Sequence, residues 1–568
     1  MTHEDGAASL AALADRYWQD TLRAGPLFAT SIGDRRYDHL LDDKSPAAVS
    51  SERSRLEATL AEARAIDPNS LDPADRITHS VLVELVGADL AAIDSGVHEW
   101  TLDPLEGPQV MFNDVESFQP VREPAEGEAM VDRWRAMGPW IDALIDRLRR
   151  SLAQDRVAAV DPVDRVVDEL DDLLERPSDS WALLKPARVE HPGWPAGATE
   201  RFRSHLASAV EDGVAPAFRR LRTVLAEEIR PAARPGDRAG IMHIPGGVDA
   251  YRRLIRHHTS LDLTPDELHA TGVREIERID REFVELGGRT LGSSGLTDTL
   301  ARLREDGRLY FGSREEVFAK ADSALARAGE AMAQWFGMLP RARCEVVRMG
   351  AHEEKHSSIA YYRQPATDGS RPGQYFVNTY APETRPRYEA EALAYHEAIP
   401  GHHLQIAIGQ EREGLPEFRR HLGPTAFFEG WGLYTERLSD EMGLYSADLD
   451  RFGILSFDAW RACRLVVDTG MHALGWSREQ AIDYMAAHTA LGRNNIANEV
   501  DRYIVWPGQA LAYKTGQLEI LGVRSEARAA LGERFDIRAF HDAVLGNGAV
   551  PLATLRELVG GYVEAARA

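Results

Sequence analysis

Residues 387–405 read RYEAEALAYHEAIPGHHLQ. The part up to Ile399 predicts a helix with His396 and Glu397 near its end. Pro400 lacks a backbone N–H and Gly401 is conformationally permissive, so the helix is expected to break between Glu397 and the next two histidines. This interrupted helix predicts a mainly helical fold with a chemical site at the break.

Two histidines flanking a Pro-Gly turn do not fit the usual zinc pattern, H-E-x-x-H, in which the histidines lie one helical turn apart. On a straight helix, six residues turn by about 240° and rise about 9 Å, and seven rise about 10.5 Å. Neither His402 nor His403 could then share an ion with His396 at about 2.0–2.1 Å. If two residues of the turn bulge out, His402 returns to His396. We favour His402 over His403, and both stay open at this point.

A third candidate ligand follows in FFEGWGLYTERL (427–438), which predicts a second helix. It carries Glu429, and the nearby Gly430 and Gly432 would let another backbone approach closely. Two histidines and one glutamate with an open position are the ligands of a catalytic zinc ion. We therefore predict one zinc ion on His396, His402 and Glu429. Glu397 would be the general base that takes a proton from the activated water.

The rest of the chain has mostly helical periodicity. Apolar stripes predict helices over 131–153, 265–287 and 316–338, the second with an N-terminal capping box at Thr264. Residues 357–380 instead have two aromatic and β-branched runs around a turn, which predicts a β-hairpin or sheet edge beside the motif helix. We expect two helical lobes, 1–235 and 236–568, around a deep cleft.

Composition narrows the classes of function. The 568 residues have a formal net charge of −24, which makes nucleic-acid binding and membrane-surface binding poor expectations. Two cysteines do not support a disulfide scaffold. The first residues lack the features of a signal peptide, and no apolar run is long enough to span a bilayer. The expected location is the cytoplasm.

Five separated motifs carry a resemblance to a known family. They are GPLFATSIGDRRYD (25–38), HEAIPGHHLQ (396–405), FFEGWGLYTERL (427–438), RLVVDTGMHALGWSREQA (464–481) and RYIVWPGQALAYKTG (502–516). The chain resembles the bacterial family DUF885, a domain of unknown function. That family is thought to be related to helical zinc peptidases such as thimet oligopeptidase, angiotensin-converting enzyme and carboxypeptidase Taq. The resemblance spans nearly the whole chain.

The resemblance implies roles for further residues. A strand edge beside the zinc helix would bind the substrate backbone, a tyrosine or histidine late in the chain would stabilise the oxyanion, and a cation would bind a substrate carboxylate. The candidates for these three roles are Tyr375 to Thr379, including Asn378, for the backbone; Tyr513 and His472 for the oxyanion; and Arg464, Arg502 and Lys514 for the carboxylate.

The function hypothesis is a zinc-dependent hydrolase, of carboxypeptidase or oligopeptidase type, that cleaves amide bonds of short peptides or peptide-like compounds. One alternative keeps the chemistry but acts on an amide of a specialised metabolite. Another is a metal-free binding protein with a degenerate peptidase cleft, and the interruption at Pro400 motivates it.

Overall fold

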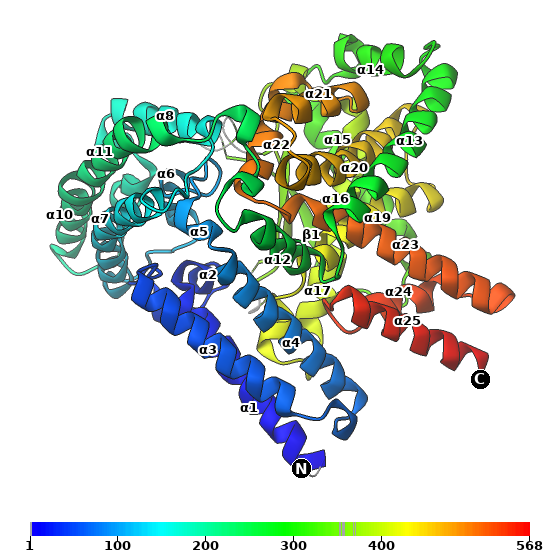
Figure 1. Cartoon of the computed structure of the whole chain (residues 1–568), viewed down its shortest axis with the longest axis horizontal. Coiled ribbons are helices and arrows are strands. Elements are labelled where there is room, and N and C mark those ends of the chain that lie inside the picture. The colour runs from blue at the N-terminus through cyan, green and yellow to red at the C-terminus, as the bar shows by residue number, and fades with distance from the viewer. Residues whose placement is uncertain (1–2, 351–353, 355–357, 367–368, 370) are drawn as a thin grey trace.

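The structure is a computed structural model that describes residues 3–350, 354, 358–366, 369 and 371–568. It is mainly helical, with one small sheet (Figure 1), as the sequence predicts. The helices before the sheet are α1 (His3–Ala24), α2 (Pro26–Ser31), α3 (Pro46–Ala65), α4 (Pro73–Ser95), α5 (Val97–Trp100), α6 (Pro108–Asp114), α7 (Pro124–Leu152), α8 (Val160–Glu175), α9 (Lys185–Arg188), α10 (Ala198–Ser208), α11 (Ala215–Val224), α12 (Gly247–Thr259), α13 (Pro265–Thr290), α14 (Leu296–Glu305) and α15 (Arg314–Trp335).

The sheet and ten more helices complete the described chain. They are β1 (Cys344–Arg348), β2 (Ala360–Arg363), β3 (Gly373–Val377), α16 (Ala390–Glu397), α17 (His402–Glu411), α18 (Glu417–His421), α19 (Thr425–Glu441), α20 (Arg451–Ala473), α21 (Arg478–His488), α22 (Arg493–Val505), α23 (Ala512–Leu531), α24 (Ile537–Leu545) and α25 (Leu552–Arg567). Among the described residues, no helix is long and apolar enough to cross a membrane.

Capping side chains set where the predicted helices begin. The Thr264 hydroxyl accepts from the backbone N–H of Glu267, whose carboxylate accepts from the N–H of Thr264, and Pro265 opens α13. Ser477 and Gln480 make the same pair of bonds at α21. These reciprocal bonds satisfy N–H groups that have no partner within the helix.

The small sheet has the strand order β1-β3-β2. β2 and β3 are antiparallel, with Tyr362 opposite Tyr375, so the predicted hairpin is confirmed. β1 pairs with β3 in parallel, with Val346 opposite Tyr375. β3 is therefore the central strand, and β1 and β2 are the edges of the described sheet.

The hydrophobic cores show which parts of the chain pack together. Residues 102–229 supply a core of their own, which ends close to the boundary predicted near residue 235. Apolar residues of α1, α3 and α4, however, share a core with α19, α23, α24 and α25. Figure 1 shows α7, α8, α10 and α11 together at the left of the molecule, α1, α3 and α4 along its lower edge, and α24 and α25 at the lower right. Two lobes divided near residue 235 therefore stay a prediction.

Two closely packed helix pairs surround the motif helix. α20 packs against α13, and α19 packs against α23 (Figure 1). Gly430 of α19 and Gly516 of α23 make the second crossing close, because a Cβ at Gly430 would lie 2.4 Å from the carbonyl carbon of Gly516. α16 lies against α15, α19 and α20, so the motif helix is enclosed by helices.

Candidate metal centre

The Pro-Gly interruption forms a turn between two helices. α16 ends at Glu397 and α17 begins at His402, with a cis peptide bond between Ile399 and Pro400 in the turn. A Cβ on Gly401 would lie 1.8 Å from the carbonyl oxygen of His396, so only glycine fits there. The backbone N–H of His403 donates to the carbonyl of Ala398 at 3.0 Å and ties the second helix to the first.

This turn brings three of the predicted ligands together. One donor atom each from His396, His402 and Glu429 lie within 4.8 Å of one another. The Glu429 Oε2 atom is 4.0 Å from His396 Nε2 and 3.8 Å from His402 Nε2. The two imidazole rings are 4.8 Å apart and perpendicular. The bulge that the sequence predicts therefore places His402, rather than His403, next to His396.

Burial favours the metal-binding form of both histidines. It lowers the pKa of His396 to about 3, and it lowers the pKa of His402, with the nearby His396 as the second cause. Both imidazoles are neutral near pH 7 for this reason, and neutral imidazole is the form that binds metals. The side chain of Glu429 is 22% exposed, so solvent reaches the cluster from its side.

Glu436 contacts the His396 ring on the side away from Glu429. The sequence analysis did not identify this residue. Its Oε1 atom lies 2.8 Å from His396 Nδ1, so the ring can donate to this carboxyl group and turn Nε2 towards Glu429. Metal-binding histidines commonly have such a partner. Glu436 follows Glu429 by two helical turns on α19, a spacing that could have indicated a shared face. Gly432 lies between them, and a Cβ there would be 2.7 Å from His396 Cε1.

Glu397 is half-buried beside the cluster. Burial raises its pKa, whereas the neighbouring His402 acts in the opposite direction. The charge of Glu397 also acts on Tyr375, whose pKa is raised well above its usual value, first by burial and then by this charge. A carboxyl group in this position can act as an acceptor and then as a donor of a proton.

His403 has a different environment. Its Nδ1 lies 2.9 Å from the hydroxyl oxygen of Tyr362, and its Nε2 lies 3.1 Å from the carbonyl oxygen of Ala342. A Cβ on Gly373 would be 2.4 Å from Nδ1. His403 therefore anchors the sheet to α17 while His402 faces the cluster.

The predicted strand-binding residues lie in the sheet interior. Tyr375 is in β3, which pairs with β1 on one side and β2 on the other. Asn378 is buried, and its amide donates to the carbonyl oxygens of Glu354 and Ser358. The expectation that a substrate strand pairs along Tyr375 to Thr379 is corrected, because both sides of β3 are already paired.

Three of the late candidates gather around one ring. Arg464 lies over the ring of Tyr513, 4.4 Å from its centre, and Arg502 donates to the Tyr513 hydroxyl at 3.4 Å. Arg464 also donates to Tyr503 and Glu499, each at 2.9 Å. Its charge lowers the pKa of His396, after burial and Arg461 as larger causes, so this group is near the cluster.

The other two late candidates have structural partners. Both ring nitrogens of His472 are bonded to backbone, Nδ1 to the N–H of Ile241 and Nε2 to the carbonyl of Tyr503. Lys514 is fully buried and ion-paired with Asp458 at 2.5 Å and Glu275 at 2.9 Å. The structure does not bring these two side chains to the cluster, and their contacts give them roles in packing.

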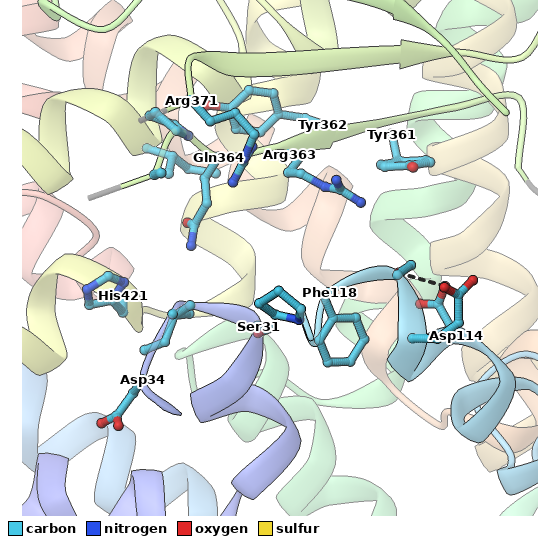
Figure 2. Close-up of a pocket in the computed structure, with 18 of the residues that line it drawn as sticks. Ser31, Asp34, Asp114, Phe118, Tyr361, Tyr362, Arg363, Gln364, Arg371 and His421 are labelled. Atoms are coloured by element: carbon cyan, nitrogen blue, oxygen red, sulfur yellow. Dashed lines mark hydrogen bonds between the residues drawn. The ribbon is translucent and has the colours of Figure 1, made fainter. Parts of the chain in front are cut away.

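A large cavity of about 2440 Å³ lies next to α17, the helix that begins at His402. Ile406 and Gln410 of α17 line it, whereas His396, Glu397, His402 and Glu429 are not among its lining residues. Figure 2 shows Tyr361, Tyr362 and Arg363 of β2 on one side of this cavity, facing Ser31 and Phe118 across it. The edge strand β2 therefore borders the cavity, whereas no residue of the central strand β3 lines it.

Comparison with protein families identifies the chain. Residues 26–559 match the family described as bacterial protein of unknown function, DUF885. The chain belongs to this family. The family resemblance is thereby confirmed, whereas the relation of DUF885 to zinc peptidases stays a prediction. No curated protein matches this DUF885 protein.

Two solved structures resemble this DUF885 protein along its whole length. A candidate lipoprotein from Colwellia psychrerythraea is 27% identical, with a TM-score of 0.91 and 99% of each chain covered. A candidate lipoprotein of unknown function from Shewanella oneidensis is 18% identical, with a TM-score of 0.73; 97% of this chain and 99% of the other are covered. The second likeness shows the fold alone. Neither description supports the expected cytoplasmic location.

Proposed function

We propose that this DUF885 protein is a zinc-dependent hydrolase that cleaves amide bonds of short peptides or peptide-like compounds. The single observation that carries the proposal is the convergence of His396, His402 and Glu429 within 4.8 Å. Ligands at 2.0–2.2 Å around a tetrahedral zinc ion are about 3.3–3.6 Å apart. The observed 3.8 and 4.0 Å separations need side-chain movements of less than about 1 Å to reach that spacing.

The donor set also fits zinc chemically. Neutral imidazoles and a carboxylate are zinc ligands, and the bond from His396 to Glu436 orients the imidazole as such sites require. Zinc held there would supply a Lewis acid and lower the pKa of water. His396, His402 and Glu429 would hold the ion, which leaves Glu397 available as the acid–base group.

Glu397 performs the proton transfers in this proposal. Its carboxylate takes a proton from the attacking water and returns it to the leaving amine. Burial raises its pKa, which brings its proton affinity closer to working pH. The Tyr513 hydroxyl, held by Arg502, is the candidate to stabilise the oxyanion. The fully bonded His472 is the weaker of the two candidates.

The substrate surface is revised relative to the sequence-based expectation. An extended peptide that pairs with this sheet would add to β2, because β2 is an edge strand and borders the cavity. The cavity volume of about 2440 Å³ would accommodate a peptide of several residues. A peptide-like amide of a specialised metabolite would use the same chemistry and stays an alternative.

The metal-free binding protein is less well supported. It was motivated by the interruption at Pro400, yet the turn keeps His396 and His402 adjacent. The expected cytoplasmic location has no support from the comparisons. The relative from Colwellia psychrerythraea, 27% identical, is described as a candidate lipoprotein, which favours a role at the cell envelope.

Metal content and peptide cleavage test the proposal together. Protein purified without chelators or a histidine tag should contain about one zinc per chain by elemental mass spectrometry. His402→Gln should lose the ion, whereas the matched His403→Gln should retain it. Glu397→Gln should keep zinc and lose about 10²–10⁴-fold in cleavage of a short-peptide mixture. Wild-type protein that takes up no zinc, or undiminished cleavage in Glu397→Gln, would overturn the proposal.

A further inference from the structure

Arg461 is a buried cation on α20, the helix that packs against α16 and α19. The residue is 7% exposed. Its guanidinium lies 4.8 Å from the ring centre of Phe457, 4.4 Å from that of Trp460 and 5.8 Å from that of Tyr513. The side chain is thus held in place by three aromatic rings, one of which belongs to the oxyanion candidate.

Two nitrogen atoms of the Arg461 guanidinium group have no hydrogen-bond acceptor among the described residues. Its Nε and Nη1 atoms are buried and have no hydrogen-bond partner within the described part of the chain. Stacking on aromatic rings uses the face of the guanidinium and leaves its N–H groups unsatisfied. Burial of N–H donors costs free energy unless they bond to an acceptor. A bound ligand could supply the acceptor that Arg461 lacks.

A second arginine lies beside Arg461 on α20. Arg464 lies one helical turn further along α20 and over the same two rings, 4.9 Å from Trp460 and 4.4 Å from Tyr513. Glu499 pairs with Arg464 at 2.9 Å, but within the described residues the Nη1 atom of Arg464 is also buried without a hydrogen-bond partner. An acceptor between the two guanidinium groups would satisfy N–H groups of both.

Both arginines lie on a helix that borders the metal centre. α20 packs against α16, which carries His396, and against α19, which carries Glu429. Arg461 also lies 5.8 Å from the ring centre of Tyr513, the oxyanion candidate. A guanidinium fork suits a planar carboxylate, which accepts two N–H bonds.

We propose that Arg461, assisted by Arg464, binds the free carboxylate of the substrate, so that the site acts on peptides with a free C-terminus near the cleaved bond. This inference rests on the proposed hydrolase function and narrows it to carboxypeptidase-type substrates. It also replaces Lys514 as a carboxylate-binding candidate, because Lys514 is already neutralised by Asp458 and Glu275.

Binding of paired peptides tests this role without turnover. The zinc-loaded Glu397→Gln protein is titrated by calorimetry with N-acetylated tripeptides, each as the free acid and as the C-terminal amide. The free acids should bind about tenfold or more tightly than their amides. Adding Arg461→Gln should reduce that preference to about twofold or less, and Arg461→Lys should leave it intermediate, because lysine keeps the charge and loses the fork.

Arg451→Gln is the matched control, since Arg451 lies on the same helix, has a side chain that is 41% exposed, and is paired with Asp440. It should keep the preference for free acids. Equal binding of acids and amides by the parent, binding of neither form, or an unchanged preference in folded Arg461→Gln would overturn the inference. The comparison of free acids with amides in the Glu397→Gln protein tests the inference even if the Arg461 variants do not fold.

The same experiment separates the two proposals. Preference for free acids that is lost in Arg461→Gln, in a protein whose wild type cleaves no peptide, would support the carboxylate site and count against the hydrolase. Cleavage of peptide acids and amides at equal rates would support the hydrolase and overturn the role of Arg461.

Discussion

Replacement of Glu436 by alanine tests whether the metal centre depends on a residue that is not itself a ligand. The Glu436 carboxyl is the acceptor for His396 Nδ1 at 2.8 Å. The side chains of His396 and Glu436 are only 4% and 1% exposed, so water cannot readily replace the lost acceptor. The variant keeps all three predicted ligands, and any change in zinc affinity must come from their orientation.

The expected magnitude follows from this burial. Loss of a partner behind a metal-binding histidine typically weakens metal binding by about 10–100-fold, which corresponds to about 1.4–2.7 kcal/mol. The upper end applies here, because the vacated space is enclosed and the ring would keep a buried N–H without an acceptor. Glu436→Gln is the matched control, since its amide oxygen can accept the same bond.

Zinc affinity is measured by competition with a chromophoric chelator, using protein whose fold is checked by circular dichroism. Glu436→Ala should bind zinc about 100-fold more weakly, and Glu436→Gln should stay within about threefold of wild type. A folded Glu436→Ala variant with wild-type zinc affinity would refute the view that this contact orients His396.

Three further outcomes follow from buried contacts. Gly432→Ala should weaken zinc binding at least about tenfold in the same competition assay, because its Cβ would displace the His396 ring; Gly522→Ala, on an open helix face, should have no effect. Lys514→Met should lower the free energy of unfolding in urea by about 1.5–3 kcal/mol, because Asp458 and Glu275 lose a buried charged donor while Arg278 stays paired with both, and unchanged stability would contradict that role. Burial raises the pKa of Asp468 to about 7, so the folded state holds an extra proton between about pH 4 and 7 and loses stability as pH rises through this range. Asp468→Asn should therefore gain roughly 2–4 kcal/mol over wild type between pH 5 and pH 8 in chemical denaturation, and a constant difference would argue against this titration.

Local patterns in the sequence predicted much of the fold. Capping residues at Thr264 and Ser477 marked helix starts, and the Pro-Gly dipeptide correctly indicated a bulge that returns His402 to His396. The hairpin β2–β3 followed from two aromatic and β-branched runs that are close in sequence. In each case the deciding residues lie in one short segment of the chain, where a sequence pattern can be recognised.

Features that depend on distant partners could not be predicted. β1 pairs in parallel with a strand almost thirty residues away, so β3 became a central strand instead of an edge. Lys514 looked available for substrate because its carboxylate partners lie on α13 and α20. Two nitrogen atoms of Arg461 have no hydrogen-bond partner among the described residues. This depends on how distant segments pack around the side chain, which no local pattern encodes.

The shared core of the first and last helices has a consequence for biosynthesis. α1, α3 and α4 bury apolar residues against α23, α24 and α25, and Ser80 of α4 bonds Thr554 of α25 at 2.7 Å. The N-terminal helices leave the ribosome long before these partners are translated, at about 5–20 residues per second. Nascent chains would therefore carry an exposed apolar surface for about half a minute or more. Chaperone holding, rather than early folding of the N-terminal helices, is expected to govern the yield of this protein.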